Sequence, residues 1–96
     1  MKLYDWSLEK NEEIKIQRNI SFEDIVFSMS RDGLMDILEH PDQQRYPGQR
    51  IFIVNVDDYA YVIPFIEDEK TIFLKTIIPS RKMTKKYLGG KRRENK

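Results

Sequence analysis

Residues 73–88 read FLKTIIPSRKMTKKYL, and the character of the sequence changes within this stretch at Pro79. The residues before the proline are mainly apolar and predict a β-strand over Thr71–Ile78. Ser80, directly after the proline, is a favourable N-cap residue for a helix. The stretch therefore predicts a core strand that leads into a short helix at one end of a sheet.

The predicted helix carries a dense group of positive charges, and Lys75 lies upstream of it on the strand; the helix cations are Arg81, Lys82, Lys85 and Lys86. Residues 1–70 contain 8 Lys or Arg and 15 Asp or Glu residues, a net charge of −7. Residues 71–96 contain 9 Lys or Arg residues and one Glu, a net charge of +8. A basic segment on an acidic body favours an anionic partner, although the same charges are consistent with a segment that only balances the body.

Length and composition limit the class of protein. The 96 residues are expected to form one domain over residues 1–88, followed by a basic, mobile tail over residues 89–96. Because there is no cysteine, disulfides, thiolate metal sites and thiol catalysis are excluded. No apolar run approaches the ~20 residues of a membrane span, so a cytoplasmic protein without membrane contact is expected. Without a glycine-rich phosphate loop or a pair of histidines at metal spacing, we expect no cofactor and no metal.

Two helices are predicted in the N-terminal third of the chain. Ser7 is the expected N-cap of a helix over Leu8–Arg18, although the apolar residues of this segment do not share one face. Ser21 followed by Asp24 resembles a capping box and predicts a second helix that ends near Arg31. The apolar residues of this second segment recur at helical spacing: Phe22, Ile25, Val26 and Met29.

The rest of the domain is typical of β-strands, which are expected over Leu34–His40, Arg50–Val56, Tyr59–Ile66 and Thr71–Ile78. Short connections predict a four-stranded antiparallel sheet with both helices on one face, which is an α+β fold. Pro64 lies inside a predicted strand and implies a bulge or an unpaired edge at that point. If the helices cover the aliphatic face, the open face carries Lys75 together with Tyr59, Tyr61, Ile63 and Phe65.

Four short motifs occur in a recognisable order: YDWSLEKN at residues 4–11, ISFED at 20–24, HPD at 40–42 and PSRKMT at 79–84. In this order and spacing they make the chain resemble the BrnT-type toxins of bacterial type II toxin–antitoxin systems over residues 4–87. The chain departs from the family at residues 17–19, where Gln-Arg-Asn replaces a common Lys-His-Gly. It also departs near residues 86–87, where the family often has a glutamate, so the resemblance is to a divergent branch.

The resemblance implies a RelE-like fold, in which two N-terminal helices pack on a four-stranded antiparallel sheet that a short basic helix follows. It also implies a metal-independent endoribonuclease that cleaves mRNA, either free or on the ribosome, and inhibits translation. The implied protein partner is a cognate antitoxin, which would cover the toxic surface and through which oligomers would form.

Metal-independent RNA cleavage needs groups that activate the ribose 2′-hydroxyl, stabilise the charge on the attacked phosphate and protonate the leaving oxygen. Arg81 is the first candidate for the phosphate, since it starts the basic helix and matches the family's arginine, and Lys75 is the second. His40, the only histidine, and Tyr87 are the candidates for proton transfer. Each of the first three also has a structural interpretation: Arg81 on a solvated helix, Lys75 extending its charge to the rim, and His40 in a turn.

Further contacts with RNA phosphates are predicted for Arg50, Lys82, Lys85 and Lys86. Arg50 has an alternative that we favour, which is an ion pair with Glu39 on the neighbouring strand.

Several other residues are open to two interpretations. Tyr59 and Tyr61 are candidates for base stacking or for the core, whereas Trp6 and the pair Lys10 and Asn11 are expected to have structural roles. The sequence therefore also supports a second hypothesis, a non-catalytic module that binds nucleic acid or an acidic partner. A third hypothesis is a protein-interaction module that uses an aromatic sheet face.

Overall fold

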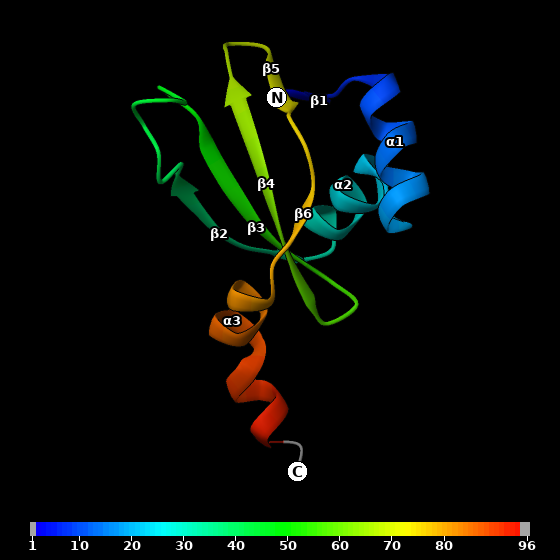
Figure 1. The fold of residues 1–96 in the computed structure, drawn as a ribbon, viewed down its shortest axis with the longest axis vertical. Helices are drawn as coiled ribbons and strands as arrows, with labels where there is room; N and C mark the ends of the chain where they lie inside the picture. The colour runs from blue at the N-terminus through cyan, green and yellow to red at the C-terminus, as the bar shows by residue number, and fades with distance from the viewer. Residues whose placement is uncertain (1, 95–96) are drawn as a thin grey trace.

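The computed structural model describes residues 2–94, with side chains as far as Gly89. These residues form three helices and a mixed six-stranded sheet, a small α+β domain (Figure 1). In chain order the elements are β1 Leu3–Asp5, α1 Leu8–Arg18, α2 Phe22–Ser30, β2 Leu34–Glu39, β3 Arg50–Val56, β4 Tyr59–Glu67, β5 Thr71–Leu74, β6 Ile78–Pro79 and α3 Arg81–Glu94.

The predicted starts of the two N-terminal helices are confirmed. The Ser7 hydroxyl accepts a hydrogen bond from the Lys10 N–H at 3.1 Å, and α1 ends at Asn19, which has the left-handed conformation common at helix ends. At the start of α2 the Ser21 hydroxyl accepts from the Asp24 N–H, and the Asp24 carboxylate accepts from the Ser21 N–H at 2.9 Å. The predicted capping box is therefore present, with aspartate in place of glutamate.

The sheet has the strand order β1-β5-β4-β3-β2, and the short strand β6 pairs with β4 beside β5. The pairings β2–β3, β3–β4 and β4–β5 are antiparallel as predicted, but β1 adds a parallel edge. The predicted single strand Thr71–Ile78 is wrong, because the chain forms two separate strands, Thr71–Leu74 and Ile78–Pro79. The expected four-stranded, fully antiparallel sheet is therefore replaced by a larger, mixed one.

Pro64 on β4 explains the split between β5 and β6. Its carbonyl accepts a hydrogen bond from the Lys75 N–H at 2.8 Å, so this edge of Pro64 faces the segment that joins the two strands. In an antiparallel ladder one residue offers its N–H and its C=O to the same neighbour, and proline has no N–H to offer. The ladder therefore breaks opposite Pro64, which confirms the predicted irregularity at this residue.

The break also changes which side chains face the core. Leu74 and Ile77 are both buried in one cluster, although an unbroken strand would place them on opposite faces of the sheet. Ile78, which an unbroken strand over Thr71–Ile78 would place on the same face as Leu74, is 43% exposed instead. The predicted assignment of faces fails after Lys75 because the chain leaves the regular alternation there.

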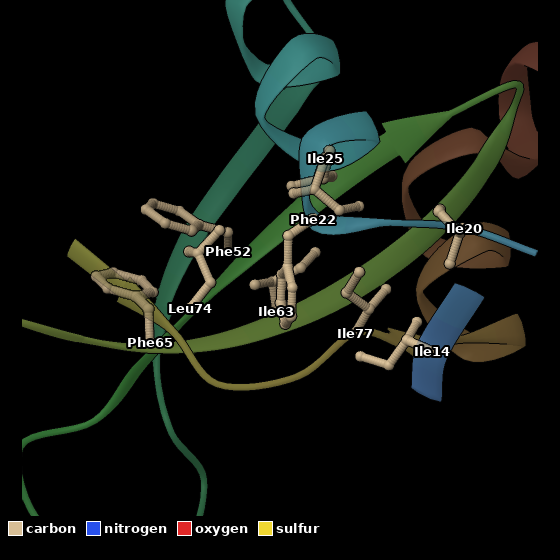
Figure 2. Packing of buried hydrophobic residues seen from close by; sticks show 10 residues of the cluster. Ile14, Ile20, Phe22, Ile25, Phe52, Ile63, Phe65, Leu74 and Ile77 are labelled. Atoms are coloured by element: carbon tan, nitrogen blue, oxygen red, sulfur yellow. The ribbon is translucent and has the colours of Figure 1, made fainter. Parts of the chain in front are cut away.

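Helices α1 and α2 cover the sheet face that bears the aromatic residues. Figure 2 shows Phe22 and Ile25 of α2 beside Phe52, Ile63 and Phe65 of the sheet, and all five side chains are buried in one cluster. The rings of Phe52 and Phe65 stack with their centroids 3.9 Å apart. The prediction of an open aromatic face is therefore wrong, because these aromatic rings form the main core.

The opposite face of the sheet is covered in part by α3, whose residues Met83 and Tyr87 pack against Ile51, Ile53 and Ala60. Both faces of the sheet thus carry helices. The last helix continues past Leu88, where the predicted tail begins, as far as Glu94, and residues 95–96 lie outside the described part of the chain.

Candidate functional site

The start of α3 is fixed to strand β4 by backbone and side-chain hydrogen bonds. The Ser80 N–H donates to the Ala60 carbonyl at 3.0 Å, and the Ser80 hydroxyl accepts from the Met83 N–H at 3.1 Å. This confirms the predicted N-cap and the predicted passage from strand to helix. Arg81 is the first residue of α3 and is exposed, so its guanidinium and the free N–H groups of the first turn can both face an anion.

Thr84 makes a second connection between α3 and β4, which the sequence analysis missed. Its side chain is only 5% exposed, and its hydroxyl accepts a hydrogen bond from the Ala60 N–H at 2.8 Å. The same hydroxyl donates to the Ser80 carbonyl at 2.8 Å. The Thr84 hydroxyl thus accepts from the Ala60 N–H, which the Ser80 carbonyl would do if the ladder between β6 and β4 continued. The sequence did contain a signal for this role, because Thr84 is a small hydroxyl residue among lysines and lies four positions after the N-cap Ser80.

The first two turns of α3 present four positive charges that form no ion pair with a described side chain. The four cations Arg81, Lys82, Lys85 and Lys86 are all exposed. Among the side chains that the structure describes, the ion pairs are Lys2–Glu67, Lys15–Glu12 and Arg50–Glu67, none of which uses a cation of α3. The α3 cations are therefore available to oxygen atoms of an anionic ligand.

Tyr87 has a structural bond that ties α3 to strand β2. Its hydroxyl donates to Oδ2 of Asp36 at 2.6 Å. This bond, together with the N–H of Ile37, lowers the pKa of the Asp36 carboxyl, and it raises the pKa of Tyr87. A tyrosine whose proton is held by a carboxylate is a poor general base, so the predicted proton transfer by Tyr87 would first require this bond to break.

Lys75 lies in the segment between β5 and β6, and its side chain is exposed. Its Nζ is 5.9 Å from the centroid of the Phe73 ring. Lys75 follows the buried Leu74, so it belongs to the sheet face that also carries α3. The structure thus places Lys75 and the α3 cations on one face of the sheet. Tyr59 and Tyr61, the predicted neighbours of Lys75, lie on the opposite face with Ile63 and Phe65.

His40 lies at the other end of the sheet from the start of α3. It follows Glu39, whose pairing partner on β3 is Arg50. The start of α3 is bonded through Ser80 to Ala60, whose partner on β3 is Asn55. Five residues of β3 separate the two levels, which is about 16 Å at ~3.3 Å per residue. The His40 Nδ1 accepts from the Asp42 N–H at 3.0 Å, and its ring lies 4.5 Å from that of Tyr46. These contacts fit the interpretation of His40 as a turn residue.

Arg50 also lies at the end of the sheet away from α3. Its partner is Glu67 on β4 and not the expected Glu39, and its guanidinium carbon lies 5.2 Å from the Phe65 ring centroid. Glu67 also accepts a hydrogen bond from Lys2, which is the main reason why the pKa of the Glu67 carboxyl is lowered. The predicted RNA contact at Arg50 is therefore separated from the cations of α3.

Asn11 joins two of the sequence motifs. It is 2% exposed; its side-chain oxygen accepts from the Phe22 N–H at 2.8 Å, and its amide donates to the Glu23 carboxylate at 2.8 Å. The Trp6 ring stacks on Phe22 with centroids 5.6 Å apart. The motifs at residues 4–11 and 20–24 thus occur together because they pack α1 against α2, and the structural interpretation of Trp6 and Asn11 is confirmed.

Comparisons with models of known families, with curated proteins and with solved structures find no match to this chain. Within residues 2–94 no group of three or more His, Asp or Glu side chains is arranged to hold a metal ion. The helices described for these residues include none that is both long and apolar enough to cross a membrane. The resemblance to BrnT-type toxins stays a prediction.

Proposed function

We propose that this protein is the toxin of a type II toxin–antitoxin system, with a RelE-like arrangement of helices and sheet, and that it cleaves mRNA in the cytoplasm. The observation that carries the proposal is the start of α3, where exposed Arg81 lies on a helix N-terminus fixed to the sheet by Ser80. This arrangement suits the phosphate of an RNA backbone. A cognate antitoxin would inhibit the protein by covering this surface.

Arg81 would bind the phosphate that is attacked and stabilise the charge that develops on it. The flanking phosphates would contact Lys82, Lys85 and Lys86, which follow on the same helix. Lys75 lies on the same sheet face and would contact a phosphate further along the strand. Proton transfer has less support, because His40 is distant and Tyr87 is bonded to Asp36. Cleavage is therefore expected to be slow.

The lack of a suitable proton-transfer group near Arg81, among the side chains that the structure describes, favours a second candidate function. In this alternative the protein binds nucleic acid or an acidic partner through α3 without cleaving it. The two functions differ in one measurement, since both bind RNA and only the first leaves cleaved products.

The experiment incubates the purified protein with mRNA, with and without ribosomes, and follows the products by gel electrophoresis. Arg81→Ala and Lys75→Ala are expected to abolish or strongly slow cleavage. Arg50→Ala is the matched control, since it removes an exposed arginine at the other end of the sheet. If the Arg81 variant cleaves as fast as the wild type, the site assignment fails. If the wild type binds RNA and leaves it intact under both conditions, the non-catalytic function replaces the first.

A further inference from the structure

The sheet face that carries α3 has an open area beside the helix. α3 covers Ile51, Ile53 and Ala60, and the surface toward β5 stays exposed. We call this open area the β5 platform and define it by Ile66, Phe73, Lys75 and Ile78. Ile66 is 42% exposed and Ile78 is 43% exposed.

Strand pairing shows that the platform residues share one face. Phe65 and Leu74 are opposite each other in the β4–β5 ladder, and both are buried on the side of α1 and α2. Their neighbours Ile66 and Phe73, which are also paired, therefore point to the other face. Phe73 is only partly buried, and among the described residues it packs in neither of the two core clusters. Part of the Phe73 side chain is therefore open to solvent on this face.

The Phe73 ring and the first turn of α3 lie on the same sheet face, with the cation of Lys75 between them. Phe73 lies opposite Ile66, and Ser80 bonds to Ala60, so six residues of β4 separate the two levels, about 20 Å at ~3.3 Å per residue. Lys75 lies between them, since its N–H bonds to Pro64. On the other side of Phe73, the edge strand β1 carries an acidic residue, Asp5, which is the parallel pairing partner of Phe73.

We infer that the β5 platform binds an unpaired base of single-stranded RNA by stacking on Phe73, while the backbone follows Lys75 toward Arg81. This inference rests on the proposed binding of RNA at α3. A partly exposed aromatic ring with a lysine beside it, on the sheet face that leads to a basic helix, suits the binding of a single strand. Lys75 Nζ lies near the ~6 Å limit of a cation–π contact, so it can move to a phosphate when a base occupies the ring face.

The bases of a duplex are stacked on one another and cannot reach such a ring, so the platform would select unpaired RNA. An acidic peptide would use the cations and the isoleucines equally well, but it would gain nothing specific from the aromatic ring. RNA and an acidic peptide can therefore be distinguished as ligands by removing either the aromatic ring of Phe73 or the base of the RNA.

The experiment measures binding of a short, fluorescent, single-stranded RNA by anisotropy at several salt concentrations. Phe73→Leu keeps an apolar side chain and removes the aromatic face, and it is expected to weaken binding about 5- to 150-fold, the range for loss of one stacked base. The slope of affinity against salt should not change, because no charge is removed. Phe73→Tyr keeps the ring and is expected to bind like the wild type.

An oligonucleotide with abasic sites supplies the matched control on the RNA side. The wild type should bind it more weakly than normal RNA by about the factor lost in Phe73→Leu, and the variant should lose nothing further. Thermal unfolding of each variant checks its fold, and the abasic and Phe73→Tyr results decide the matter if Phe73→Leu does not fold.

Four outcomes would overturn the inference. Wild-type affinity in Phe73→Leu, or an equal loss on normal and abasic RNA, would exclude stacking, and the proposed function would survive if Arg81→Ala still lost binding. Equal affinity for duplex and single-stranded RNA would exclude selection of unpaired bases. Absence of RNA binding by the wild type would overturn this inference and the proposed function together, and would leave the platform to a protein ligand.

Discussion

Replacing Thr84 by valine tests whether its hydroxyl holds α3 on the sheet. Valine has nearly the same shape, so packing is kept, but the Ala60 N–H loses its acceptor in a buried position. A buried donor left without a partner costs about 1–3 kcal/mol. The Ser80 carbonyl does not lose its only donor, because the Thr84 N–H also bonds to it at 3.0 Å. The cost should therefore come almost entirely from the Ala60 N–H.

For a domain of this size, ~1 kcal/mol corresponds to about 4–8 °C in melting temperature, so Thr84→Val should melt roughly 4–24 °C below the wild type. Thr84→Ser keeps the hydroxyl and is the matched control, with a smaller loss from the missing methyl group. Urea denaturation followed by circular dichroism gives the free energy of unfolding, and hydrogen exchange should show lower protection of the Ala60 amide in the valine variant. If Thr84→Val is as stable as Thr84→Ser, the hydroxyl does not have the role argued for it.

Three further changes have distinct expected results. Asn11→Ala removes the acceptor of the buried Phe22 N–H and should lower the free energy of unfolding by about 1–3 kcal/mol in urea denaturation, whereas Glu23→Gln, which keeps an acceptor for the Asn11 amide, should stay close to the wild type. Tyr87→Phe should be less stable than the wild type at neutral pH. This difference in stability should shrink at low pH, as the pH falls below the ordinary Asp36 pKa of 3.8 and through the lowered pKa of Asp36 in the folded protein. It should also shrink at high pH, as the pH rises above the ordinary Tyr87 pKa of 10.0 and through its raised pKa in the folded protein. A difference in melting temperature that does not change with pH would contradict this. Lys85→Ala should weaken RNA binding regardless of sequence and reduce the magnitude of the salt slope by about one, whereas Arg50→Ala, at the far end of the sheet, should leave the slope unchanged.

The helix starts could be predicted because the interactions that decide them are local. Ser7, Ser21 and Ser80 each accept a hydrogen bond from an N–H three residues later, so a window of four residues contains the whole signal. The same is true of the connection at residues 57–58, where two aspartates adopt the positive φ angles of a tight hairpin turn. The irregularity at Pro64 could be predicted for the same reason, because proline itself lacks the N–H that strand pairing needs.

The covered faces of the sheet could not be predicted in this way. Strand β3 is apolar on both sides, with Ile51 and Ile53 on one face and Phe52 and Val54 on the other, so alternation alone does not show which side the N-terminal helices occupy. Both sides are in fact buried, because α3 covers the first pair. A strand with two apolar faces was the available signal that helices lie on both sides of the sheet.

The placement of Arg81 and Lys75 follows from buried anchors and not from a continuous ladder. The chain between β5 and β6 is held by Leu74 and Ile77 in the core, and the Ile77 carbonyl, which lies outside both strands, accepts a hydrogen bond from the Arg18 guanidinium at 3.0 Å. Arg18 thus holds the backbone next to the candidate site. An arginine bonded in this way fixes the position of the chain and does not transfer protons, because its guanidinium stays protonated.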